Sequence, residues 1–198
     1  MNAEQLQRFF NTPEPFLDPQ TGYKERSVEW FERTILSDFL KLQLPGPLLD
    51  AGCGYGYFTR RYAAHYQDVI AIDFSDERVA GAKRVNSAPN ITYMRADLTA
   101  LGLVIPRPVK SIVTSAVVQH IPPEWRGNVF QNLHSVSEKG AVMVMYDSIG
   151  DGWDGFYGPI NPAWIRTQLT SSWTLRSVDY CFDALQGEKI HRLILDRA

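Results

Sequence analysis

Short apolar runs alternate with helix-like segments between residues 47 and 147 of this chain. Each run carries its β-branched and aliphatic residues consecutively, which is typical of strands covered on both faces of a parallel sheet. The five runs span residues 47–50, 68–73, 91–97, 111–117 and 141–147. The helix-like segments between them span residues 57–66, 76–85 and 123–136. This alternation predicts a doubly wound α/β fold, with a mostly parallel sheet and helices on both faces.

The two ends of the chain add elements outside this alternation. Residues 173–182 and 189–196 have the pattern of strands, and the link between them is too short for a helical crossover. We therefore expect an antiparallel pair at the C-terminal end. Near the N-terminal end, Ser27 is a helix N-cap candidate, and the apolar spacing after it predicts a helical preface. Residues 149–164 are rich in glycine and aromatic residues and have no clear period.

Composition limits the classes of protein to consider. The chain has 198 residues, 44% apolar and 21% charged, as expected for one globular domain. It has 20 Lys and Arg residues and 22 Asp and Glu residues, and the basic residues form no run, so we expect no nucleic-acid partner. Cys53 and Cys181 are too few for a disulfide framework and lack metal-ligand spacing, so we expect no metal and a reducing compartment. No segment has the length and apolarity of a membrane span, and we expect a soluble, cytoplasmic protein with no membrane partner.

Three glycines, Gly52, Gly54 and Gly56, follow the first predicted strand. Ligands of open α/β sheets bind outside the carboxyl ends of the strands, so this loop is the expected binding site. A dinucleotide site has the spacing G-x-G-x-x-G, but here the third glycine comes one residue early. Asp50 would also repel a pyrophosphate in a partly desolvated cleft. S-adenosylmethionine carries a sulfonium, an ammonium and no phosphate, so Asp50 would attract it, and the loop indicates this cofactor.

Two further aspartates end the next two predicted strands. Asp73 lies 21 residues after Gly52, where a carboxylate can accept hydrogen bonds from both hydroxyl groups of a ribose. Asp97 lies where a carboxylate can accept a hydrogen bond from an adenine amino group, and Phe74 offers an apolar surface for the purine. Because parallel strands end at the same edge of a sheet, we expect these carboxylates to surround one nucleoside.

The segments LLDAGCGYGYF, VIAIDFSDERVAGAK, ITYMRADL and SIVTSAVVQHIPPEW resemble the class I S-adenosylmethionine-dependent methyltransferases, in particular their small type 11/12-like group. The resemblance covers residues 45–147. It implies a Rossmann-like sheet of seven strands with the last strand antiparallel. The chain departs from the family in two places. It has one glycine, Gly140, where the family has K-P-G-G before the fifth strand, and Arg78 where the family has an apolar residue.

The resemblance also implies roles for residues on the cofactor side. It places Asp50, Gly52 and Gly54 around the methionine end of S-adenosylmethionine, and Asp73 at the ribose. The product would be S-adenosylhomocysteine, which keeps the nucleoside and loses the methyl group.

Other roles implied by the resemblance lie nearer the methyl group. Asp97 and the Leu98 backbone would contact the adenine, and Ser115 would line the pocket below the sulfonium. A neutral hydroxyl or an ammonium acceptor must lose a proton, and His120, after the fourth predicted strand, is the catalytic candidate. Family members often carry a histidine here that only tethers the loop, so both interpretations of His120 remain open. Gln119 is an alternative residue for lining this pocket.

The parts outside the core are expected to frame the methyl acceptor. We expect one domain over residues 1–198, with a helical preface and acceptor cap (1–44), a cofactor-binding core (45–147), and a lid with the antiparallel strands (148–198). Glycines within 149–164 would let the lid close over the bound pair. Aromatic and acidic side chains there and in the preface can hold a planar or cationic molecule or a sugar. They are Tyr23, Trp30, Asp151, Trp153, Asp154, Phe156, Tyr157 and Trp164.

The sequence thus favours a methyltransferase that acts on an oxygen or nitrogen atom of a small molecule, such as a natural product or a sugar. A nicotinamide-dependent oxidoreductase is the rival from another enzyme class, and Asp50 and the early third glycine count against it. A second rival is a non-catalytic partner subunit that keeps the same fold and nucleotide site. The binding residues alone do not separate this partner from an enzyme.

Overall fold

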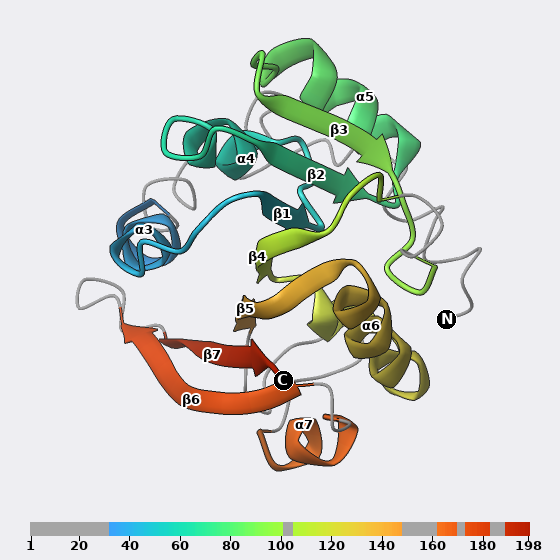
Figure 1. The fold of residues 1–198 in the computed structure, drawn as a ribbon. Coiled ribbons are helices and arrows are strands. Elements are labelled where there is room, and N and C mark those ends of the chain that lie inside the picture. Colours follow the sequence, from blue (N-terminus) through green and yellow to red (C-terminus); the bar gives the residue numbers. More distant parts are fainter. Residues whose placement is uncertain (1–31, 101–104, 148–161, 170–172, 183–188) are drawn as a thin grey trace.

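In the part of the chain that the structure describes, a seven-stranded sheet forms the centre and helices cover both of its faces (Figure 1). The computed structural model describes residues 32–100, 105–147, 162–169, 173–182 and 189–198. The strands are β1 (Leu48–Ala51), β2 (Val69–Asp73), β3 (Ile91–Arg95), β4 (Val109–Ser115), β5 (Ser137–Asp147), β6 (Trp173–Phe182) and β7 (Lys189–Arg197). Their order is β3-β2-β1-β4-β5-β7-β6, and β7 runs antiparallel to both of its neighbours. The predicted doubly wound sheet with an antiparallel last strand is confirmed.

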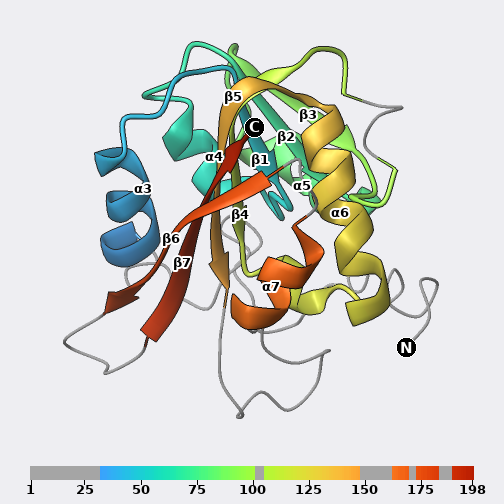
Figure 2. The ribbon, with the colours of Figure 1, turned by 60° about the horizontal axis from the view of Figure 1, so that its bottom comes forward.

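Successive residues of a strand pack against helices on opposite faces of the sheet. The helical elements are η1 (Glu32–Leu36), α3 (Ser37–Lys41), α4 (Tyr57–Tyr62), α5 (Asp76–Val85), η3 (Val118–His120), α6 (Pro123–Ser135) and α7 (Pro162–Gln168). Leu48 and Val69 pack with α3 and α4, whereas their neighbours Leu49 and Ile70 pack with α6 and α7. Figure 2 shows the two helix layers on either side of the sheet. Strands buried on both faces explain the continuous apolar runs of the sequence.

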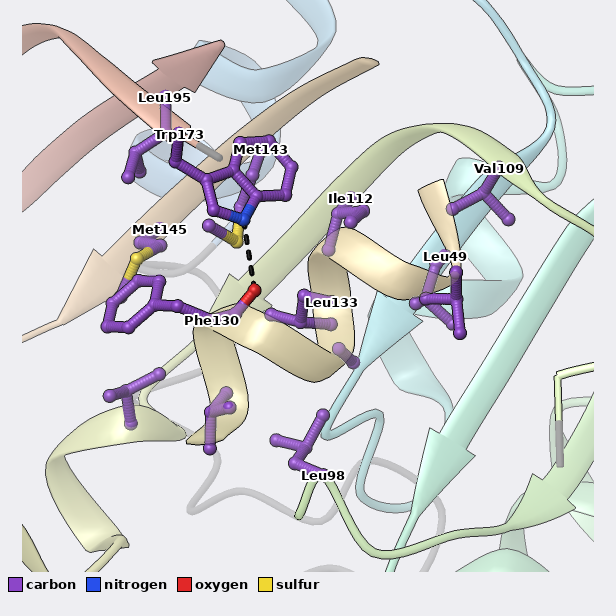
Figure 3. Packing of buried hydrophobic residues seen from close by; sticks show 14 of the residues in the cluster. Leu49, Leu98, Val109, Ile112, Phe130, Leu133, Met143, Met145, Trp173 and Leu195 are labelled. Atoms are coloured by element: carbon purple, nitrogen blue, oxygen red, sulfur yellow. Dashed lines mark hydrogen bonds between the residues drawn. The ribbon is translucent and has the colours of Figure 1, made fainter. Parts of the chain in front are cut away.

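The larger apolar cluster lies between the sheet and α6 (Figure 3). Phe130 and Leu133 of α6 are fully buried, since they lie on the helix stripe that faces Met143 and Met145 of β5. Trp173 of β6 joins this cluster, and its indole Nε1 donates a hydrogen bond of 3.0 Å to the Phe130 carbonyl. This bond satisfies a buried polar group and ties the C-terminal strands to α6.

The structure corrects several predicted boundaries. α4 ends at Tyr62, shorter than the predicted helix of residues 57–66. β4 ends at Ser115, two residues early, because Ala116 adopts a positive φ of 54° that no strand permits. β3 is an edge strand with exposed positions, so the expectation that both faces of every strand are covered was wrong for it.

The described end of the helical preface is fixed to the sheet and to α4 by polar side chains. Asp38 accepts a hydrogen bond of 2.8 Å from the Tyr146 hydroxyl and forms an ion pair of 2.6 Å with Arg192. Glu32 accepts a hydrogen bond of 2.6 Å from the Tyr57 hydroxyl and forms an ion pair of 2.5 Å with Arg61. Glu32 therefore lies beside the helix that follows the glycine loop.

Replacing Leu133 with alanine tests the importance of the cluster under α6. We expect the free energy of unfolding to fall by about 2–5 kcal/mol, since a fully buried leucine leaves a cavity. Val85→Ala is the matched control, because Val85 is 39% exposed at the end of α5. Its effect should stay within about 0.5 kcal/mol. Urea denaturation followed by circular dichroism measures both values, and equal losses for the two variants would contradict this account of the core.

Candidate functional site

Two buried carboxylates lie on adjacent strands near the carboxyl edge of the sheet. Asp50 is in β1 and Asp73 ends β2, and each residue is only 6% exposed. The glycine loop folds over this edge, because the Gly52 and Cys53 backbone N–H groups both donate to the Ile72 carbonyl at 2.8 Å. The structure therefore brings together the glycine loop and the first two of the predicted aspartates.

Asp73 connects the glycine loop to the turn before α5. One of its oxygens accepts a hydrogen bond of 2.9 Å from the Gly54 N–H, and the other accepts one of 3.0 Å from the Ser75 N–H. Burial raises the pKa of Asp73, while the charge of Arg78 and these N–H groups lower it. A carboxylate oxygen has a second lone pair, so both oxygens can still accept hydrogen bonds from a ligand.

Asp50 accepts a hydrogen bond from a residue that was not predicted from the sequence. The hydroxyl of Thr59, which is fully buried in α4, donates a hydrogen bond of 2.5 Å to an oxygen of Asp50. Burial raises the pKa of Asp50 to about 7, although the Thr59 hydrogen bond opposes this shift and the neighbouring charge of Asp73 adds to it. A cation beside Asp50 would favour its ionised form and lower this pKa again.

Two of the loop glycines are needed for different reasons. Gly52 has a φ of +91°, and a Cβ placed on it would lie 2.3 Å from Cγ2 of Val117. Gly54 has a φ of +54°, and its Cβ would have no atom of a described residue within 4 Å. Packing against the turn after β4 thus requires Gly52, whereas the described residues leave space at Gly54 where a ligand can approach the backbone.

The predicted adenine contacts lie next to the end of β2. The Ala96 N–H donates to the Asp73 carbonyl at 2.9 Å, which places the turn after β3 at the same edge. Asp97 is exposed, and its Oδ1 accepts hydrogen bonds of 2.8 Å from both the N–H and the hydroxyl of Thr99. Leu98 is buried, and its carbonyl accepts a hydrogen bond of 3.1 Å from Asn132. Phe74 is partly exposed on the neighbouring turn.

The turn between β4 and α6 carries the predicted residues near the methyl group. Ser115 ends β4, and no described residue forms a hydrogen bond with its buried Oγ. His120 is in η3, with its Nε2 3.4 Å from the Gln119 side-chain nitrogen. Burial, assisted by the charges of Arg78 and Arg126, lowers the pKa of His120 to about 4. This imidazole is neutral at physiological pH and a weaker base than an exposed histidine.

Arg78 occupies the position where the sequence departs from the resembling family. It is half-buried in the first turn of α5, where its backbone N–H donates to the capping hydroxyl of Ser75 at 3.2 Å. Its charge lowers both the pKa of Asp73 and the pKa of His120. The charge of Arg78 therefore acts both on Asp73, at the predicted ribose contact, and on His120, near the predicted methyl group.

Several predicted residues of the acceptor side fall outside the description. Trp164 lies in α7, but the structure does not describe its side chain. The other preface and lid residues named above, and the lid itself up to residue 161, lie outside the described residues. Among the residues that are described, no three His, Cys, Asp or Glu side chains are placed to hold a metal ion, and no helix is long and apolar enough to cross a membrane.

The comparisons with known proteins agree with this geometry. Residues 48–140 match the family model described as a methyltransferase domain. The structure of the whole chain superposes on magnesium protoporphyrin IX methyltransferase from Synechocystis, solved with bound S-adenosylmethionine, with a TM-score of 0.74 and 18% identity over 100% of both chains. It also superposes on the N-methyltransferase NodS from Bradyrhizobium japonicum with a TM-score of 0.67 and 18% identity, over 84% of this chain and 96% of that one.

Curated relatives act on different acceptors. The chain is 26% identical to the malonyl-[acyl-carrier protein] O-methyltransferase of Pectobacterium atrosepticum, over 76% of this chain and 56% of that protein. It is 29% identical to a 23S rRNA uracil-C5-methyltransferase of a Marinomonas species, over 56% of this chain and 24% of that protein. The chain thus spans between about a quarter and just over half of the length of these relatives.

Alanine at Gly52 and at Gly54 separates folding from binding. Gly52→Ala should lower stability by more than about 2 kcal/mol, because it adds a clash with Val117 to the strain of a positive φ. Gly54→Ala should lower stability by only about 1 kcal/mol but weaken the binding of S-adenosylhomocysteine at least about tenfold, since its methyl group enters the space proposed for the ligand. Thermal unfolding and calorimetry measure the two effects. Normal binding by a stable Gly54→Ala variant would remove Gly54 from the site.

The raised pKa of Asp50 predicts a pH dependence of cofactor binding. Its carboxyl group is mostly protonated below a pKa of about 7 and ionised above it, so attraction for a cation should grow as the pH rises from 6 to 8. We expect the affinity for S-adenosylmethionine to increase about five- to tenfold relative to Asp50→Asn. Comparison with this variant removes the contribution of the cofactor's own amino group, which also titrates. A constant ratio of the two affinities across this range would contradict the proposed role of Asp50.

Proposed function

We propose that this protein transfers the methyl group of S-adenosylmethionine to an oxygen or nitrogen atom of a small molecule. Residues 48–140 match the family model of a methyltransferase domain, and the chain has the class I fold. The observation that carries this proposal is the pair of buried carboxylates, Asp50 and Asp73, under a glycine loop with positive φ angles. The charge of this pair suits a cationic nucleoside and opposes a pyrophosphate.

The proposed cofactor contacts follow the carboxyl edge of the sheet. Asp73 accepts hydrogen bonds from the ribose hydroxyl groups with the lone pairs that Gly54 and Ser75 leave open. Asp50 and the glycine loop surround the positively charged methionine end. Phe74, Asp97 and the Leu98 backbone contact the adenine, and this assignment is supported by the bond between the turn after β3 and the end of β2.

The chain mainly has to align the two reacting molecules and keep water out. When bound, S-adenosylmethionine supplies an electrophilic methyl group on a positively charged sulfur. Direct displacement needs the acceptor atom, the methyl carbon and the sulfur in one line, and alignment of this kind accounts for much of the rate that an enzyme provides. Ser115 lines the pocket below the sulfur, and its buried Oγ, with which no described residue forms a hydrogen bond, supports this placement.

His120 remains the candidate for receiving the acceptor's proton. Its neutral imidazole is in the protonation state that a base requires. Its pKa of about 4 also fits the alternative role, in which His120 tethers the turn after β4 and the proton leaves by another route. An acceptor that is already deprotonated, such as a carboxylate, would need no base at all.

A small-molecule acceptor is favoured over RNA or protein. The excess of acidic residues and the lack of a basic run give the chain little attraction for a polyanion. The described end of the preface lies beside α4, where Glu32 accepts a hydrogen bond from Tyr57 directly after the glycine loop. This contact supports the proposal that the preface contributes to a cap over a small acceptor. Relatives that methylate uracil in RNA make nucleic acid the main competing acceptor.

Two measurements test this function. S-adenosylhomocysteine should raise the midpoint of thermal unfolding and NAD should leave it unchanged, whereas stabilisation by NAD alone would favour the oxidoreductase.

With methyl-labelled S-adenosylmethionine and a cell extract, wild-type protein should label the small-molecule fraction, and Asp73→Ala should lose at least about 90% of this transfer because it loses the proposed ribose contact. Label in RNA or protein would overturn the proposed acceptor class. Cofactor binding without transfer to any fraction would support the non-catalytic partner.

A further inference from the structure

Asp147 is a buried carboxylate that the proposed cofactor contacts do not use. It ends β5, at the same carboxyl edge as Asp50 and Asp73, and it is fully buried. Its Oδ1 lies 3.1 Å from the Val117 N–H and 3.4 Å from the Gln119 N–H, both of which donate to it. Its Oδ2 has no hydrogen-bond partner among the residues that the structure describes. A carboxylate is expensive to bury even with partners, so its retention at this position calls for a reason.

The backbone that Asp147 contacts is strained. Ala116 has a φ of 54°, and its N–H donates a hydrogen bond of 2.7 Å to the Tyr146 carbonyl. A non-glycine residue in this region costs about 1 kcal/mol and persists only where its surroundings enforce it. β5 supplies part of that enforcement, through the Tyr146 carbonyl and through Asp147.

A cation holds the other side of the same turn. Arg126 of α6 is only 3% exposed, and its guanidinium donates hydrogen bonds of 2.8 Å to the Ile121 carbonyl and 3.2 Å to the Gln119 carbonyl. Two N–H groups of the turn therefore point to a carboxylate, and two of its carbonyl groups point to a guanidinium. Burial raises the pKa of Asp147 to about 7, although the N–H groups of Gln119 and Val117 and the charge of Arg126 oppose this shift.

The turn held in this way touches the glycine loop. The side chain of Val117 packs so closely on Gly52 that a Cβ there would lie 2.3 Å from it. Ser115 precedes the turn, and Gln119 and His120 complete it. A shift of the turn would move the wall of the cofactor pocket and the candidate proton acceptor together.

We infer that Asp147 is a positioning residue: together with Arg126, it holds the 116–121 turn against the glycine loop and thereby fixes the placement of Gln119 and His120 at the methyl-transfer site. The relevance of this placement to catalysis rests on the proposed function. The hold of Asp147 and Arg126 on the 116–121 turn is a property of the folded chain without ligands, so it can be tested separately from catalysis.

Two variants distinguish the hydrogen bonds of Asp147 from its charge. Asp147→Asn keeps an oxygen that can accept from both N–H groups, whereas Asp147→Ala removes it. We expect Asp147→Ala to weaken S-adenosylhomocysteine binding about tenfold and Asp147→Asn to stay within about threefold of wild type. Asp196→Asn is the control, because Asp196 is a partly exposed carboxylate of β7 paired with Arg176.

The titration of His120, followed by NMR of its imidazole carbons, provides a measurement that needs no ligand. In wild type and Asp147→Asn the ring should stay neutral between pH 5 and 8. In folded Asp147→Ala the loosened turn should admit water, and the pKa of His120 should rise toward about 6.5. An unchanged His120 titration in folded Asp147→Ala, or equal loss of binding in the Asn and Ala variants, would overturn the inference.

A measurement on the wild type covers the case in which Asp147→Ala does not fold. The Val117 and Gln119 amide protons should shift together as Asp147 titrates, because a hydrogen bond to a carboxylate differs from one to a carboxylic acid. The Leu133 amide, within α6, should not follow this titration. If the chemical shifts of the Val117 and Gln119 amide protons do not change as Asp147 ionises, the inference is overturned, whether or not the chain binds S-adenosylhomocysteine.

Discussion

Carboxylates buried at the carboxyl edge of the sheet are the constraint on which the rest of this structure depends. Asp50 and Asp73 lie on adjacent strands, and burial raises the pKa of both. The hydroxyl of Thr59 and the N–H groups of Gly54 and Ser75 hold them in place without neutralising their charge. Burying two carboxylates in this way costs free energy of folding. A positively charged ligand offsets part of this cost when it binds. A phosphate-free, cationic nucleoside is a ligand that satisfies this requirement.

The fold turns separate loops into one continuous wall around that edge. The loop after β1 packs on the turn after β4 through Gly52 and Val117, and β5 and α6 hold that turn through Asp147 and Arg126. Strain at Ala116 is maintained by these neighbours rather than by local sequence. The proposed cofactor side and the proposed acceptor side are therefore in contact through packed residues, although these residues are spread over most of the sheet.

Local pattern was sufficient to predict the strands and most helices, because each buried strand is a short apolar run and each helix has its own period. It also placed Asp73 at the end of the second strand, where the apolar run stops, and the structure has it there. The contact of Asp73 with a ribose is still a prediction. It could not identify Thr59, whose contact with Asp50 depends on how α4 packs on the sheet. The same holds for Asp147, because nothing in the sequence indicates that the end of β5 faces the backbone of residues 117–119. Asp97 was predicted to end the third strand, but β3 ends at Arg95, so Asp97 lies in the turn beyond it, where its carboxylate accepts hydrogen bonds from Thr99. Its adenine contact is still a prediction.

The central claim is that acidic groups at the strand ends bind the nucleoside of S-adenosylmethionine. A crystal structure of the complex with S-adenosylhomocysteine tests it most directly. The account predicts both ribose hydroxyl groups within about 2.7–3.2 Å of the Asp73 carboxylate and the amino group of the ligand on the Asp50 side of the glycine loop. A complex in which the ligand lies elsewhere, or in which Asp73 contacts no part of it, would contradict the account.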